Sequence, residues 1–303
     1  MTEREAAGPA LGRGTFDLLE RGLERVTARA VRSPGPASFG AAAALGRLRN
    51  RLSRRWPSPE QVRTLFPHLD KGEAEDVAWA IGGLEARNRL LVACLRRGGL
   101  EPLRGLLRTP TALADLRPPL ILGTFHMGAL HALGLALERL PGPVLALRQG
   151  PLYTPRPPLT IVTSAGGEQA RAAAFQRALV HLKSGGFVAL ALDLPAGPGI
   201  SVPCLGRTLE LARGPFALAR ITGAPLVPLA ASWERGGVEV QVGDVIAPAA
   251  AVEAPAEDSA AKSIRWEGTL AAAAAGWLER YVRETPGELG LGLLRSLLGE
   301  EIA

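Results

Sequence analysis

The sequence predicts an α/β protein in which a mixed, mainly parallel sheet is flanked by helices and preceded by an N-terminal helical layer. Between residues 119 and 246, short apolar segments alternate with helical ones, the pattern of a sheet with helices packed on it. Before residue 117, apolar residues recur at helical spacing among arginines and glutamates. We therefore expect an N-terminal helical region (1–117), an α/β core (118–246), and a linker with C-terminal helices (247–303).

The composition is that of a folded chain. It has 303 residues, of which 47% are hydrophobic and 21% charged, so it can bury a large core and is not disordered overall. Its two cysteines, Cys94 and Cys204, form no CxxC pair and fit a reducing compartment. The first residues lack the apolar centre of a signal peptide, and no run reaches the length of a membrane span. We expect a cytoplasmic protein, peripherally associated with the inner face of the cell membrane.

The net charge of +6 comes almost entirely from arginine, because only Lys71, Lys183 and Lys262 are lysines. A genome that favours Arg and Ala codons would account for this. Attraction to an anionic partner, such as a lipid surface, a coenzyme phosphate or an acidic carrier protein, would account for it equally well. Nucleic acid is not expected as a partner, since aromatic residues are 5% and no basic tract is interleaved with them.

The N-terminal region is expected to contain helices at residues 15–32 and 41–56, a short helix that starts at Ser58, and a long helix at 73–97 interrupted at Gly82 and Gly83. Ser58 followed by Pro59 is typical of a helix start. The arginines of the second helix and Trp56 at its end suit an anionic membrane surface, or alternatively the solvated face of a helix that packs elsewhere.

The core is expected to contain strands at residues 120–125, 144–147, 160–163, 187–192, 200–204, 226–232 and 238–242, with helices at 127–140, 167–184 and 213–222. The proline-rich segment 151–158 suits neither element and is predicted to be a surface loop near the site. An Ala/Pro-rich linker follows, and then helices at 257–284 and 288–298.

One boundary in this core concentrates reactive groups. The apolar strand expected at 120–125 ends at His126, where a helix is expected to begin. Ligands of open α/β sheets bind at the carboxyl ends of strands, and the first amides of a helix are unpaired donors. His131 lies close by, so two of the four histidines fall within six residues, whereas His68 and His181 fit surface or packing positions.

Several kinds of chemistry are excluded by the motifs that are missing. Histidines five residues apart do not share a metal on one helix face, and no acidic cluster or CxxC pair stands beside them. The G-x-S-x-G elbow of a serine hydrolase and the glycine patterns of dinucleotide and P-loop sites are absent. We therefore expect no metal or cofactor, and a histidine that acts as general base on a hydroxyl or an amine.

The segment Gly-Thr-Phe-His-Met-Gly-Ala-Leu-His at 123–131 resembles the His-x4-Asp/Glu block of the lysophospholipid acyltransferase superfamily, in particular its late lipid A (lauroyl/myristoyl) branch. Three more segments resemble blocks of that branch in the same order. Residues 182–193 resemble its helix, glycine turn and strand ending in Asp; residues 202–206 its Val-Pro-aromatic-aromatic-Gly segment; and residues 218–228 its final strand block. The resemblance covers residues 119–232.

The resemblance implies a glycerolipid acyltransferase-like fold and a bacterial enzyme of lipid biosynthesis. A fatty acyl group would pass from an acyl carrier protein or coenzyme A thioester to a hydroxyl or amine of a lipid acceptor, at an anionic membrane surface. His126 would be the general base, and Asp193 matches the family's strand-end aspartate. Positions implied to contact the substrate are Arg148, which matches an arginine suited to phosphate, Thr124, Gly128 and Gly206.

The sequence departs from the family at His131, which stands in place of the acidic residue. A neutral imidazole can still hydrogen-bond His126, but it supplies no negative charge, and Asp193 or Glu168 would have to supply it. Three hypotheses stay open: an active acyltransferase with His126, His131 and Asp193 in its site, a catalytically silent relative that binds acyl chains or membranes, and a hydrolase that cleaves thioesters with water.

Overall fold

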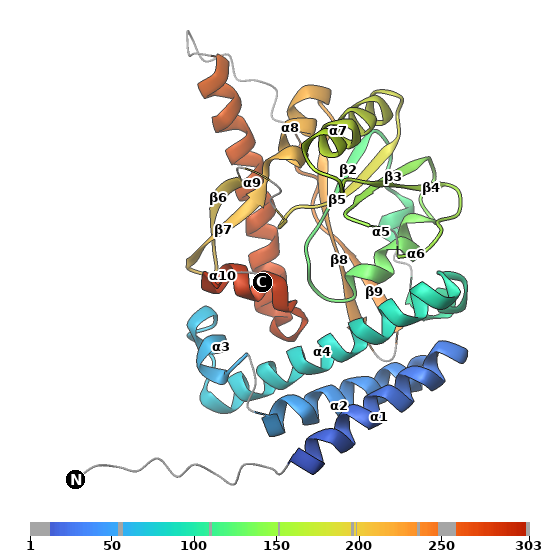
Figure 1. Cartoon of the computed structure of the whole chain (residues 1–303). Coiled ribbons are helices and arrows are strands. Elements are labelled where there is room, and N and C mark those ends of the chain that lie inside the picture. Colours follow the sequence, from blue (N-terminus) through green and yellow to red (C-terminus); the bar gives the residue numbers. More distant parts are fainter. Residues whose placement is uncertain are drawn as a thin grey trace, which may run out of the picture.

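A seven-stranded sheet forms the centre of the molecule, in the order β1-β9-β8-β2-β5-β3-β4 (Figure 1). The computed structural model describes residues 13–53, 57–108, 111–150, 152–194, 197, 199–234, 237–247 and 259–300. The strands of the sheet are β1 (Leu107–Arg108), β2 (Leu120–Thr124), β3 (Val144–Arg148), β4 (Leu159–Thr163), β5 (Phe187–Ala191), β8 (Leu226–Glu234) and β9 (Gly237–Val242). All neighbours are parallel except β8 and β9, which are antiparallel. The predicted mixed, mainly parallel α/β fold is confirmed.

Helices surround this sheet. They are α1 (Arg13–Arg32), α2 (Pro36–Ser53), α3 (Pro59–Leu65), α4 (Lys71–Gly98), α5 (Thr111–Ala114), α6 (Leu133–Leu137), α7 (Glu168–Lys183), α8 (Arg213–Thr222), α9 (Ser259–Glu284) and α10 (Leu291–Leu298), with 3-10 turns η1 (Glu101–Leu106), η2 (Leu130–Ala132) and η3 (Pro286–Glu288). Every residue of β2 is buried, which is typical of a central parallel strand covered on both faces. Ile121 belongs to the core shared with α7, α8 and α9, and Leu122 to the core shared with α4 and α6.

The helices α1, α2 and α4 lie side by side in a layer at one end of the molecule (Figure 1). The predicted interruption of the long helix at Gly82 and Gly83 is wrong, because α4 is continuous from Lys71 to Gly98. The glycines instead let two helices approach closely. A Cβ atom at Gly46 of α2 would lie 2.5 Å from the carbonyl oxygen of Gly82.

Three further expectations need correction. The strand expected at 200–204 is β6 (Gly199–Cys204), which pairs with β7 (Arg207–Ala212) in a separate antiparallel hairpin instead of joining the main sheet. Neither β7 nor the short β1 was expected. The helix predicted at 127–140 is largely absent, since the chain after His126 runs irregularly into η2 and the five-residue α6.

The predicted helix start at Ser58 is confirmed, because the side chain of Ser58 caps α3 in a capping box with Gln61.

The described helices include none that is both long and apolar enough to cross a membrane. Two arginines of α2 are used within the helical layer: Arg49 pairs with Glu20 at 2.7 Å, and Arg51 lies over the ring of Trp79 at 4.7 Å. Trp56 lies outside the described residues.

Two glycines of α2 test the close approach of the helices. The change Gly46→Ala places a methyl group against the backbone of α4 and should lower the free energy of unfolding by about 1–3 kcal/mol. The matched change Gly40→Ala, at an exposed position with no atom within 4 Å of the new Cβ, should raise it by up to about 1 kcal/mol. Urea unfolding of both variants measures the difference, and equal effects would contradict the packing described here.

Candidate active site

The candidate site lies where β2, β5 and β3 end, because parallel strands bring their carboxyl ends to one edge of the sheet. Thr124, the last residue of β2, is in register with Ala191, the last residue of β5. His126 and Asp193 each follow two residues later, so the pairing of the strands places them side by side. Arg148 is the last residue of the neighbouring strand β3.

His126 and Asp193 form a pair with two hydrogen bonds. The Nδ1 atom of His126 lies 2.8 Å from Oδ1 of Asp193, and the backbone N–H of His126 donates to Oδ2 at 2.8 Å. The side chain of Asp193 is 1% exposed and that of His126 is 31% exposed. A buried carboxylate at Nδ1 holds the hydrogen on that nitrogen and leaves Nε2 as the basic atom. Asp193 therefore supplies the carboxylate that the sequence lacks at His131, whereas Glu168 is exposed in the first turn of α7.

The loop after His126 is held by its backbone. Gly128 has a φ of 53°, and its N–H donates to the carbonyl oxygen of Glu288 at 2.7 Å. The next N–H, that of Ala129, donates to the carbonyl oxygen of Ala231 at 2.6 Å, and the N–H of Met127 donates to that of Phe125 at 2.8 Å. The expectation that helix-start amides are unpaired here is wrong, because these three amides are already bonded within the chain.

Glycine is required at two positions of this contact. A Cβ atom at Gly128 would clash with the carbonyl oxygen of Ala231, and one at Gly290 would clash with the carbonyl oxygen of His126. Gly128 is buried and has a positive φ, which L side chains rarely adopt. It therefore shapes the loop and is not among the described residues that line the cavity.

A cluster of Asn88, Trp233 and Glu288 supports the loop from behind. Asn88 Nδ2 donates to the carbonyl oxygen of Gly128 at 2.8 Å, and Asn88 Oδ1 accepts from Trp233 Nε1 at 3.3 Å. Glu288 Oε2 accepts from the backbone N–H of Trp233 at 3.3 Å. Burial raises the pKa of Glu288 to about 7, although the Trp233 N–H and the charge of Arg87 act in the opposite direction. Residues from α4, β8 and η3 thus fix the position of His126.

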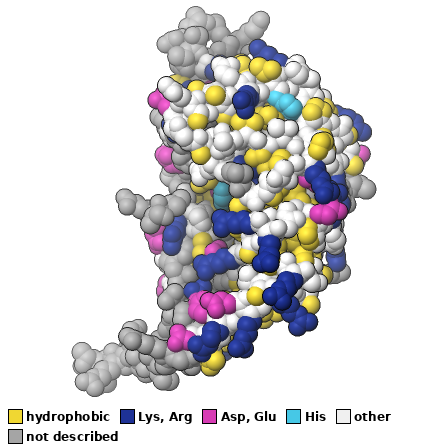
Figure 2. All heavy atoms as spheres, turned by 45° about the vertical axis from the view of Figure 1, so that its right-hand side comes forward, with side chains coloured by type: hydrophobic (Ala, Val, Ile, Leu, Met, Phe, Trp, Pro, Cys, Tyr) yellow, Lys and Arg dark blue, Asp and Glu magenta, His cyan; other side chains and the backbone are white. Residues whose placement is uncertain are grey.

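A cavity of about 670 Å³ adjoins His126, within the range of roughly 300–1,000 Å³ that is usual for small-molecule sites. Much of its wall is apolar: Leu130, Leu133, Leu137, Leu147, Leu152, Tyr153, Phe175, Leu190, Leu194, Pro215 and Leu218 line it. Leu152 and Tyr153 belong to the predicted proline-rich loop, which does lie at the site. Figure 2 shows a histidine side chain recessed in the middle of one face, with Lys and Arg side chains gathered below it.

Positive charge lines the rest of the cavity. Among the described residues of its wall are four arginines: Arg96, Arg148, Arg171 and Arg213. Two of them are held in place: Arg213 Nε donates to Glu267 at 2.6 Å, and Arg148 Nη2 lies 3.3 Å from His131 Nδ1. The cavity therefore combines an apolar space with several donors suited to a phosphate or a carboxylate.

His131 lines the same cavity as His126. Burial, together with the positive charge of Arg148, lowers the pKa of His131 to about 4. The ring is therefore neutral at pH 7. The structure does not place His131 as the partner that orients His126, because its Nδ1 faces Arg148 and Asp193 occupies Nδ1 of His126.

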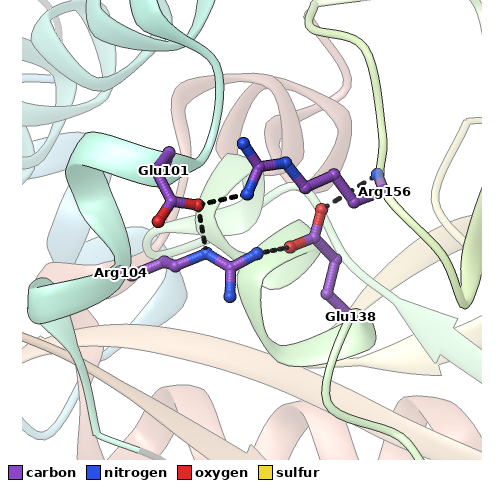
Figure 3. Close-up of polar contacts among 4 residues, drawn as sticks. All are labelled: Glu101, Arg104, Glu138 and Arg156. Carbon is purple, nitrogen blue, oxygen red and sulfur yellow. Dashed lines mark hydrogen bonds and ion pairs between the residues drawn. The ribbon is translucent and has the colours of Figure 1, made fainter.

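The loop that carries Tyr153 is anchored by ion pairs between Glu101, Arg104, Glu138 and Arg156 (Figure 3). Glu138 Oε2 accepts from Arg104 Nη2 at 3.0 Å, and Glu138 Oε1 accepts from the backbone N–H of Arg156 at 3.2 Å. Arg156 Nη1 reaches Glu101 at 2.7 Å. These bonds join η1, the end of α6 and the loop before β4, so the outer wall of the cavity is tied to the helices beneath it.

Two predicted site positions remain, Thr124 and Gly206. Thr124 lines the cavity, with its hydroxyl donating to the carbonyl oxygen of Leu190 at 3.3 Å. Gly206 is exposed in the turn between β6 and β7, with a φ of 69°, and is not among the described residues of the cavity wall. Its expected contact with the substrate stays a prediction. Asn88 and Glu288 were missed, because each is far from His126 in the sequence and neither lies in a recognisable motif.

Within the described part of the chain, no group of three or more His, Cys, Asp or Glu side chains could hold a metal ion.

Comparisons with known proteins are sparse. No protein-family model matches the sequence, and no curated protein matches it. Among solved structures, the chain is similar to the 1-acyl-sn-glycerophosphate (LPA) acyltransferase PlsC from Thermotoga maritima, with 13% sequence identity and a TM-score of 0.35, over 76% of this chain and 93% of that one. A similarity this distant assigns no function, so function has to be inferred from the site.

The burial of Glu288 gives a pH-dependent contribution to stability. A carboxyl group whose pKa is raised from 4.5 to about 7 stabilises the folded state most below pH 4.5, and this contribution is lost as the pH rises through 7. Between pH 5 and pH 8 the wild type should therefore lose up to about 3 kcal/mol relative to Glu288→Gln. Thermal unfolding of the two proteins across this range measures the difference. The exposed control Glu284→Gln should follow the wild type, and a Glu288→Gln curve parallel to the wild type would contradict the prediction.

Proposed function

We propose that this protein is an acyltransferase with His126 as general base. It transfers a fatty acyl group from an acyl carrier protein or coenzyme A thioester to a hydroxyl or amine of a lipid or lipid-like acceptor. The observation that carries the proposal is the pair of His126 and Asp193, with both hydrogen bonds at 2.8 Å, beside a largely apolar cavity. The four ordered sequence blocks that resemble the late lipid A acyltransferases support the same reading.

In the proposed reaction, Nε2 of His126 takes the proton of the acceptor hydroxyl as its oxygen attacks the carbonyl carbon of the thioester. The tetrahedral intermediate then collapses, the C–S bond breaks, and the proton on Nε2 passes to the leaving thiolate. The products are an ester and a free thiol. Asp193 stays ionised throughout, holds Nδ1–H, and stabilises the imidazolium that forms between the two proton transfers.

The cavity wall suits both the acyl chain and a phosphate group of the substrates. Its leucines and Phe175 offer an apolar space to an acyl chain, and Arg96, Arg148 and Arg171 offer donors to a phosphate of the thioester or of the acceptor. The protein's own groups suffice for this chemistry, in which the thioester is a co-substrate and no resident cofactor takes part.

The alternative hypothesis is a catalytically silent relative. It was based on the absence of an acidic residue at position 131 to orient His126. Asp193 meets that requirement at 2.8 Å, so we favour the active enzyme. Hydrolysis of the thioester by water stays an outcome of the assay described next.

The purified protein should release thiol from lauroyl-coenzyme A or lauroyl-acyl carrier protein in the presence of lysophosphatidic acid or lysophosphatidylethanolamine, with the acylated product detected by mass spectrometry. His126→Ala and Asp193→Asn should each lower the rate by about 10²–10⁴-fold, because one removes the base and the other the carboxylate that orients it. The exposed histidine variant His68→Ala should retain the parent rate.

Thiol release that is independent of any acceptor would indicate a hydrolase instead. Consumption of no thioester, with lipid bound to the purified protein, would indicate the silent relative.

We also propose that the N-terminal helical layer contacts an anionic membrane surface. Leu18 of α1 is 64% exposed and Leu48 of α2 is 42% exposed, in a layer whose surface carries many Lys and Arg side chains (Figure 2). Apolar anchors among basic groups are suited to anionic lipid.

Co-sedimentation with vesicles tests this contact. The protein should bind vesicles that contain phosphatidylglycerol more strongly than vesicles of phosphatidylcholine, and high salt should weaken the binding. Leu18→Glu and Leu48→Glu should reduce binding, whereas Val245→Glu, which changes a residue that is 60% exposed outside this layer, should not. Equal binding to both vesicle types would contradict the proposal.

A further inference from the structure

The hydrogen bond between Arg148 and His131 determines where the imidazole of His131 carries its hydrogen. Arg148 Nη2 lies 3.3 Å from His131 Nδ1. A guanidinium group has only donors, so Nδ1 of His131 must be the acceptor and cannot carry a hydrogen. The hydrogen of the neutral ring is therefore on Nε2.

His131 forms part of the cavity wall. His131 lines the cavity together with His126, and no described residue accepts a hydrogen bond from Nε2. This nitrogen is also not one of the fully buried polar atoms without a partner. It is therefore an accessible N–H donor on a ring that lines the cavity.

The neutral state of His131 is maintained by its surroundings. The ring is largely buried, and the positive groups that act on it are Arg148, His126 when protonated, and Arg96. Burial opposes a second proton on the ring most strongly and each of these charges adds to the effect, so the pKa of His131 is lowered to about 4. The guanidinium donor on Nδ1 also polarises the ring and strengthens Nε2–H as a donor.

Acyl transfer needs such a donor at this place. Negative charge develops on the carbonyl oxygen of the thioester during the attack, and enzymes stabilise it with fixed N–H groups. The amides of Met127, Gly128 and Ala129 cannot serve, because each is bonded to a carbonyl oxygen of the chain. A side-chain donor within the cavity has to take their place.

We propose that His131 is a catalytic residue that donates its Nε2–H to the oxyanion of the thioester carbonyl, with Arg148 fixing the tautomer. The inference rests on the proposed acyl transfer. No covalent bond to His131 forms, and its hydrogen stays on Nε2 throughout. Two functions are thus divided: Asp193 orients the base, and His131 stabilises the oxyanion, a role that a carboxylate at this position could not perform because it has no hydrogen to donate.

Substitutions at position 131 distinguish two roles for this residue. One is to donate an N–H group to the oxyanion, and the other is to orient His126 in place of the family's acidic residue. His131→Gln keeps an N–H donor and an acceptor for Arg148, and should keep the rate within about tenfold. His131→Leu and His131→Glu lack the donor, and each should lower kcat by about 10²–10³-fold. KM for lauroyl-coenzyme A should change little, since the lost interaction is made only in the transition state. Circular dichroism confirms that each variant is folded.

Nuclear magnetic resonance of ¹⁵N-histidine-labelled protein tests the tautomer without an assay. The signals absent from the His131→Gln spectrum belong to His131, and at pH 7 their shifts should be those of a neutral ring with hydrogen on Nε2. In Arg148→Gln this fixed tautomer should be lost.

Each result has a defined meaning. A His131→Glu or His131→Leu enzyme as fast as the wild type overturns the proposal, and so does a hydrogen on Nδ1 or a charged ring at pH 7. Failure of the proposed function itself is recognised separately, because the wild type would then transfer no acyl group and His126→Ala would have no effect, whatever the tautomer of His131.

Discussion

The site depends on the burial of one carboxylate. Asp193 is 1% exposed on its side chain, and a buried carboxylate is tolerated only where donors satisfy its oxygens. His126 provides both donors, from its ring and from its backbone. The pairing therefore fixes the ring in orientation and in tautomer at once. It follows directly from the register of β2 and β5, so the sheet places His126 and Asp193 side by side, and the loop that packs against residues 288–290 completes the site.

The arrangement at His131 shows how the neighbourhood of a residue decides its chemistry. A carboxylate following the histidine by five positions and a histidine in the same place are not interchangeable, because the first accepts hydrogen bonds and the second also donates one. Here Arg148 donates to Nδ1, so the hydrogen of the ring is on Nε2, and the ring lines the cavity. Because Asp193 at the end of another strand orients the ring of His126, position 131 is not needed for that role.

Most of the sheet could be predicted from the sequence, because buried parallel strands are continuous apolar segments bounded by turn residues. His126 was found because it directly follows such a segment, and Asp193 because it matches the strand-end aspartate of the family that the sequence resembles. The helix after His126 could not be predicted correctly, since the alanines and leucines there favour a helix, whereas the positive φ of Gly128 and its bond to Glu288 impose a loop. Asn88 gave no local signal, because its role comes from tertiary contacts with residues far along the chain.

The contact between the His126 loop and residues 288–290 also has a consequence for biosynthesis. Chains are made from the N-terminus, and the residues that form the sheet leave the ribosome before the segment that carries Glu288 and Gly290. Until that segment has emerged, the N–H of Gly128 has no Glu288 carbonyl to donate to, and Gly290 does not yet pack against the backbone of His126. A nascent chain would therefore hold the strands of the sheet before the loop at His126 is complete, and the candidate site would take its final geometry only after residues 288–290 have emerged.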